Sequence, residues 1–182
     1  LPLRYAQVEL SAVLGLRNEA LERLREARLF SFGKTDTGAV LATARVHDDY
    51  SGVISTATAT PNRAEADPVE TARGLGAVLV PYLAHQRLVE AEDAFASLSR
   101  LRLPDVVSLQ SLGDRFEYLG LSSQWQRAIA LLRHSPMTAV SEASAWSLMN
   151  TAVGLALVMR EANRADYGNH ALGASLSWTT PW

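Results

Sequence analysis

The side chains that most often do chemistry in proteins are few and scattered in this chain. It contains no cysteine, so a disulfide, a thiolate nucleophile and a cysteine-ligated metal are excluded. The four histidines share no helical face at ligand spacing; they are His47, His85, His134 and His170. His47 begins a His-Asp-Asp run, but three consecutive residues of an extended strand cannot converge on one ion. The sequence therefore predicts neither a metal site nor a bound cofactor.

Motifs that mark catalytic loops are also missing. The sequence has no phosphate loop and no nucleophile elbow, and GLGAV at 74–78 does not follow a predicted strand. The acidic residues Glu90, Glu92 and Asp93 cluster as they do on the solvated face of a helix. With no motif and no convergent nucleophile and base, we expect that the chain is not an enzyme.

The composition is that of a globular chain. Its 182 residues are 48% hydrophobic and 20% charged, which is enough for one compact domain with a proper core. The net charge of −2 argues against a generally basic nucleic-acid binder. A net charge near zero is still compatible with a local nucleic-acid site, because a few arginines can hold phosphates.

The first third of the chain is predicted to form a helix pair followed by a small β element. The helices are expected over 6–14 and 18–29, with a break at Gly15. The segments 38–46 and 52–60 alternate with period two and are rich in β-branched residues, and HDDYSG between them is a good turn sequence. A β-hairpin is the expected result.

The rest of the chain is predicted to be helical. Asp67 and Pro68 form a strong helix start, and that helix should run to about Leu98 with a kink or break at Gly74, Gly76 or Pro81. Further helices are expected over 104–120, from a cap at Ser122 or Ser123, and from Ser135 to about Asn163.

These elements predict a mainly α protein, a helical bundle with a small β-hairpin element. Residues 1–62 would hold the helix pair and the hairpin, and residues 63–182 the bundle with an extended C-terminal tail. We expect the two segments to form one compact domain.

The stretch 143–159 is apolar enough to raise the question of a membrane helix. It is 17 residues long and contains Ser144, Ser147, Asn150 and Thr151, whereas a spanning helix needs ~20 mostly apolar residues. We expect a buried helix and no membrane partner.

The C-terminal quarter combines a long Ser/Ala-rich helix with an aromatic near its start, an aromatic–basic stretch, and a final Leu-x-Trp followed by Thr and Pro. The residues are Ser144, Ala145, Trp146, Leu148, 154–156, Arg160, Tyr167, Leu176, Trp178, Thr179 and Pro181. This pattern is similar to the end of coat proteins from rod-shaped RNA viruses of the benyvirus and tobamovirus type. The chain departs from it at Asn169, where the family has Arg, and at Leu172, where it has Phe.

The resemblance implies that the chain is a structural subunit of a helical virion. The subunit would polymerise with copies of itself and package nucleic acid, and in this family the nucleic acid is single-stranded RNA. Assembly contacts would come from Tyr167, Leu176, Trp178 and Trp182. The RNA would lie where the last two helices meet, against Arg127, Arg133, His134, Ser135 and Thr138. The chain would be found in the virion, and in the host cytoplasm during assembly.

Residues 10–46 carry a competing resemblance. Helix, glycine turn, helix and hairpin resemble a winged helix-turn-helix, although Arg28 stands where that family favours Gly. On this alternative the chain is a cytoplasmic DNA-binding regulator with an α-helical dimerisation domain. Its recognition helix would present Arg17, Arg23 and Arg25 to the major groove, and its wing would carry Lys34.

Overall fold

The computed structural model describes residues 7–8, 10–12, 14–30, 40–41, 43–44, 47, 49–58, 67–103, 105–135 and 145–167. The described part of the chain is all α-helical, which confirms the expected mainly α class. The chain divides into two compact units, Leu1–Pro104 and Asp105–Trp182. Helices α4 and α5, which lie on either side of the boundary expected at residue 62, both belong to the first unit.

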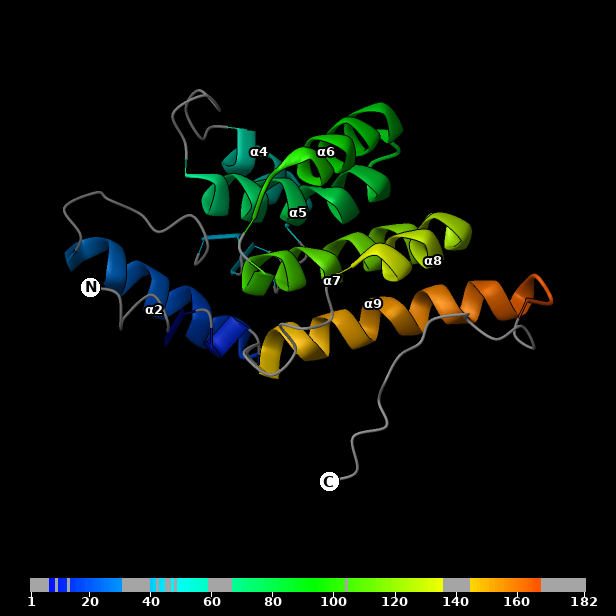
Figure 1. Ribbon diagram of the computed structural model, residues 1–182. Helices are drawn as coiled ribbons and strands as arrows, with labels where there is room; N and C mark the ends of the chain where they lie inside the picture. The colour runs from blue at the N-terminus through cyan, green and yellow to red at the C-terminus, as the bar shows by residue number, and fades with distance from the viewer. Residues whose placement is uncertain are drawn as a thin grey trace. The chain divides into compact units, whose positions relative to one another are not determined.

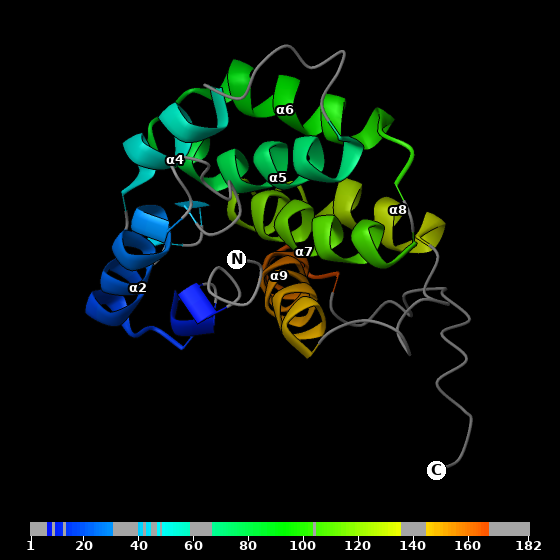
Figure 2. The same cartoon turned by 90° about the vertical axis from the view of Figure 1, so that its left-hand side faces the viewer.

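The first unit contains α2 (Arg17–Phe30), α4 (Tyr50–Thr58), α5 (Pro68–Ala84) and α6 (Leu88–Arg100). Helix α5 packs against both α4 and α6 (Figure 1; Figure 2). The space around α5 and α6 is filled by large buried side chains, among them Leu79, Tyr82, Phe95 and Leu98. A smaller core joins Val8 to Leu24 and Ala27 of α2.

The predicted β-hairpin is wrong, because no strand occurs among the described residues of 38–60. Residues 50–58 form α4 instead. The carboxylate of Asp49 accepts a hydrogen bond from the backbone N–H of Gly52 (2.9 Å), which caps the start of the helix. Val53 is then fully buried. A cap and one buried face outweigh the β propensity of the Val, Ile and Thr residues here.

The start of α5 is confirmed at Asp67 and Pro68. The Asp67 carboxylate accepts from the N–H of Val69 (2.9 Å), and Pro68 occupies the first turn, where its missing N–H costs nothing. The helix predicted from Asp67 to about Leu98 does break, but the break lies between Ala84 and Leu88, after the three positions that were predicted for it. Pro81 is inside α5, and the helix ends only at Ala84.

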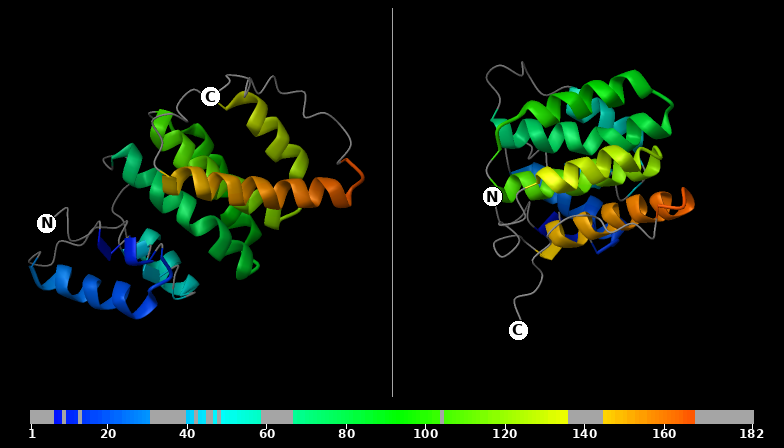
Figure 3. Two further views of the ribbon diagram at one scale, coloured as in Figure 1. Left: turned by 90° about the horizontal axis from the view of Figure 1, so that it is seen from below. Right: turned by 45° about the vertical axis from the view of Figure 1, so that its right-hand side comes forward.

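Among its described residues, the second unit contains α7 (Asp105–Leu121), α8 (Trp125–His134) and α9 (Ala145–Arg164) (Figure 3). A Cβ built on Gly113 would lie 2.7 Å from the Asn150 side chain, and one on Gly120 would lie 2.7 Å from Cβ of Leu157. A Cβ on Gly154 would lie 2.8 Å from the backbone N of Glu117. Helices α7 and α9 therefore run in the same direction at a distance that only glycine permits.

Three helices end in the same way, each with a non-glycine residue in the left-handed conformation. These are Gln86 after α5 (φ 58°), Ser123 after α7 (φ 58°) and Asp166 after α9 (φ 59°). The next N–H bonds back five residues each time, to the carbonyls of Tyr82, Leu119 and Ala162. This is the hydrogen bond of a Schellman motif.

Ser122 and Ser123 belong to the end of α7. The predicted serine cap of α8 is therefore wrong, and Gln124 takes that position with no side-chain capping bond. The Ser122 hydroxyl donates instead to the Tyr118 carbonyl (2.8 Å).

Candidate assembly and nucleic-acid interface

The C-terminal end of α8 brings together three of the predicted RNA-binding residues. Arg133 and His134 are exposed in its last turn, and Ser135 follows directly. The His134 ring, through Nδ1, is 2.7 Å from the carbonyl of Ala130, and the Ser135 hydroxyl donates to the carbonyl of Leu131 (2.7 Å). Basic groups here also complement the partial negative charge at a helix C-terminus.

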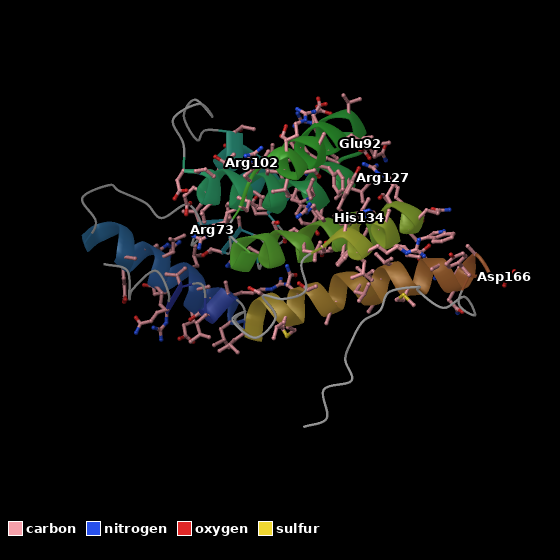
Figure 4. All side chains as sticks on the ribbon, in the orientation of Figure 1. Arg73, Glu92, Arg102, Arg127, His134 and Asp166 are labelled. Carbon is pink, nitrogen blue, oxygen red and sulfur yellow. The ribbon has the colours of Figure 1, made fainter. Side chains whose placement is uncertain are left out.

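Arg127 lies earlier on the exposed side of the same helix (Figure 4). Its guanidinium donates to the side-chain oxygen of Gln124. His134 is seven residues further on, or about 20° from Arg127 around the helix, whereas Arg133 is about 120° away. Arg127 and His134 thus share one face, and Arg133 extends the basic surface to the side.

Tyr167 has an internal partner. Its ring lies 4.8 Å from the ring of Trp125, centroid to centroid, with 39° between the planes. Since Trp125 opens α8 and Tyr167 follows α9, the pair holds the chain after α9 beside the start of α8. One face of the Tyr167 ring therefore contacts Trp125 of the same chain.

The outward side of α9 is the main feature that sequence reasoning missed. Three large apolar side chains on it are exposed, namely Leu148 (36%), Met149 (51%) and Val153 (52%). Ala152 and Ala156 are exposed between and beside them. We call these five residues the outer face of α9. The sequence analysis predicts a buried helix over 143–159, and the exposure of these side chains shows that this prediction is wrong for one side of α9.

The inward side of α9 is polar as well as tightly packed. The Asn150 amide donates to Asp114 (3.3 Å), and the Ser123 hydroxyl donates to Glu161 (3.3 Å). Burial would raise the pKa of Glu161, but the hydrogen bond from Arg160, the nearby charge of Arg164 and the Ser123 hydroxyl outweigh it, so the pKa lies below its usual value.

Arg115 of α7 is buried and donates to the hydroxyl of Ser111 (3.2 Å). Burial lowers its pKa, and the charge of Asp114 opposes that shift. This arginine thus belongs to the interior of the unit, unlike the exposed arginines of α8.

The remaining predicted site residues lie outside the described residues. They are Thr138, Leu176, Trp178 and Trp182. Their expected roles stay predictions.

The helix pair proposed for duplex DNA is arranged differently from a winged helix. Residues 40–41 and 43–44, expected in the wing hairpin, are helical. On α2, Arg23 is ion-paired with Glu19 (2.6 Å), and Arg25 lies 3.6 Å from Glu22. Both arginines thus contact carboxylates of their own helix.

The described ranges hold no group of three or more His, Asp or Glu residues placed to bind a metal ion. None of the helices in those ranges combines the length and the apolar character that a bilayer crossing requires.

Comparisons with protein families, with curated proteins and with solved structures gave no match to this chain.

Proposed function

We propose that this chain is a structural subunit that assembles with copies of itself and coats nucleic acid, as the coat protein of a rod-shaped RNA virus does. The observation that carries the proposal is the outer face of α9. Leu148, Met149 and Val153 are between 36% and 52% exposed side by side on one helix. Exposed apolar surface of this kind is typical of protein–protein contacts.

The nucleic-acid part of the proposal is supported by the surface of α8. Arg127, Arg133 and His134 are all exposed there. Such a surface would neutralise only a few phosphates in each copy, so a chain with a net charge of −2 could still coat RNA if many copies act together. These side chains would contact the sugar-phosphate backbone of the RNA, since a coat must accept every nucleotide sequence.

The experiment is to purify the chain and follow its assembly with and without single-stranded RNA, by light scattering and negative-stain microscopy. We expect large particles whose formation is lost in Val153→Asp, because a carboxylate on the outer face would have to be desolvated in the contact. Asn163→Asp is the matched control, since Asn163 is exposed on the same helix. A parent chain that stays monomeric with and without RNA would contradict the proposal.

RNA binding is tested separately from assembly. Arg133→Ala with Arg127→Ala should lower RNA affinity and reduce its log–log salt slope by about 0.7 for each single-strand phosphate contact removed. Arg23→Ala with Arg25→Ala is the control, because both side chains lie on α2 and contact carboxylates there. Sequence-specific binding of duplex DNA that this control abolishes would instead support the regulator alternative.

A further inference from the structure

Arg115 is the only charged side chain among the buried residues that the structure describes. It is 8% exposed and belongs to α7. A charged group inside a protein usually has a counter-charge, because an unpaired ion is costly to take out of water. The surroundings of this guanidinium therefore show whether its charge is balanced.

Within the described ranges, Arg115 donates hydrogen bonds to one residue. Its Nε donates to the backbone carbonyl of Ser111 at 3.3 Å, and its Nη2 donates to the Ser111 hydroxyl at 3.2 Å. Both bonds are long for N–H donors, and both acceptors are neutral. No ion pair joins the guanidinium to a carboxylate in this part of the chain. Ser111 therefore leaves the positive charge unbalanced.

The charge of Asp114 acts on Arg115 without forming an ion pair with it. It opposes the lowering of the Arg115 pKa, but burial is the larger effect. Consecutive residues of a helix point about 100° apart, and the Asp114 carboxylate accepts a hydrogen bond from Asn150 at 3.3 Å. Asp114 thus balances the charge only in part.

One edge of the guanidinium has donors left for a ligand. The two bonds to Ser111 use one N–H on Nε and one on Nη2, so both N–H groups of Nη1 and the second of Nη2 remain. The described ranges contain no fully enclosed side-chain nitrogen without a hydrogen-bond partner, so Nη1 borders on solvent. The Nη1–Nη2 edge is the one that can hold an oxyanion by two parallel hydrogen bonds.

We infer that the Nη1–Nη2 edge of Arg115 binds a phosphate group. A phosphate supplies the negative charge that Ser111 and Asp114 do not, and a planar fork matches its geometry. Because Arg115 is already largely out of water, its bond to phosphate should be stronger than that of an exposed arginine. That this phosphate belongs to the RNA backbone rests on the proposed function. Free inorganic phosphate has the same chemistry, and the experiments distinguish the two sources.

Urea unfolding in sodium phosphate and in sodium chloride of equal ionic strength tests the site with free phosphate. The unfolding equilibrium constant of the parent should fall about tenfold when phosphate is about ten times its Kd. Arg115→Met keeps an unbranched side chain without the guanidinium, so it should show only the general stabilisation that phosphate gives to any folded protein. Arg100→Met, at an exposed position of α6, is the matched control and should respond like the parent.

Three results would overturn the phosphate site. The first is an equal response of the parent and Arg115→Met. The second is a stabilisation by acetate as strong as that by phosphate, which would assign the site to a carboxylate of a protein partner. The third is a parent-like response of Arg115→Lys, because an ammonium group keeps the charge but cannot make two parallel bonds. Circular dichroism confirms that each variant is helical, and the lysine variant carries the test if the methionine variant does not fold.

Binding of a fluorescent uridine oligonucleotide, followed by anisotropy, identifies the source of the phosphate. If the RNA backbone supplies it, Arg115→Met should weaken binding several-fold and reduce the log–log salt slope by about 0.7, and Arg100→Met should do neither. Unchanged RNA binding beside a clear phosphate response would reject the RNA as the source. Assembly with RNA in a parent that shows no phosphate response would reject only this inference. A phosphate response in a chain that neither assembles nor binds RNA would reject only the proposed function.

Discussion

The α5–α6 hairpin and the α7–α9 pair solve the same packing problem in opposite ways. Around α5 and α6 the space between backbones is filled by large buried side chains such as Leu79 and Phe95. Between α7 and α9 the backbones approach until there is no room for a Cβ at Gly113, Gly120 or Gly154. The α5–α6 packing depends on large side chains, and the α7–α9 packing depends on positions that have no side chain. An added methyl group should therefore lower the free energy of unfolding at the α7–α9 contact and not in α5, whereas a shortened side chain should lower it around α5 and α6.

The largest effect is expected from removing carbon in the first unit. Leu79 is fully buried in α5, so Leu79→Ala should lower the free energy of unfolding by about 2–5 kcal/mol through lost burial and the cavity that remains. Urea unfolding followed by circular dichroism measures the change. Leu88→Ala at the exposed start of α6 should cost less than about 0.5 kcal/mol. Equal losses in the two variants would show that side-chain filling is not what holds this hairpin.

Adding one carbon to α9 should have the next largest effect. In Gly154→Ala the new Cβ would meet the backbone N of Glu117 and the backbone O of Gly113, both at 2.8 Å, so the helices must separate. We expect a loss of about 1–3 kcal/mol. Unfolding in urea of the parent and the variant measures it.

The matched control for this change is Gly74→Ala in α5. There the nearest atom to the new Cβ is Cβ of Ala57 at 4.0 Å, an ordinary contact. Alanine is the better helix former by about 0.5–1 kcal/mol, so this variant should be unchanged or more stable. The comparison between the units would fail if the two glycines responded alike.

Much of this architecture follows from the sequence where a local signal exists. Gly15 breaks the first helices with φ of 71°, and Asp67–Pro68 starts α5, both as predicted. The predicted end of α5 is wrong because the left-handed residue that ends this helix is Gln86. A glycine usually occupies such a position, and no glycine marks it in the sequence. The period-two alternation in 52–60 predicts a strand, but the hydrogen bond from the Gly52 N–H to the Asp49 carboxylate caps a helix there instead.

The candidate site was predictable only in part. Local chain order brings Arg133, His134 and Ser135 together, so the sequence was sufficient to predict this group. The outer face of α9 depends on which side of the helix faces α7. Glycine spacing in two separate helices fixes that choice, through Gly154 on one helix and Gly113 and Gly120 on the other. A single helical pattern does not contain this information, since both sides of α9 carry apolar or small residues, with Gly154 on the inner side and Val153 on the outer side.

The smallest expected effect concerns a charge beside the tight pair. The pKa of Glu161 lies below its usual value of 4.5, since burial, which would raise it, is outweighed by Arg160, Arg164 and Ser123. A carboxylate with a lower pKa in the folded state adds stability that is fully present above the unfolded pKa. That contribution is lost as the pH falls through the folded pKa.

Urea unfolding of the parent and of Glu161→Gln between pH 7 and about pH 3 measures this contribution, because the acid range brackets the carboxylate pKa values. The parent should be the more stable of the two at pH 7, and the difference should shrink as the pH is lowered below the usual value of 4.5. Replacing both Arg160 and Arg164 by Gln should reproduce most of this behaviour, because their ion pairs with Glu161 at 3.1 Å and 2.8 Å are then gone. A gap between parent and variant that stays constant down to the lowest pH would show that Glu161 acts through packing at the end of α9 and not through its charge.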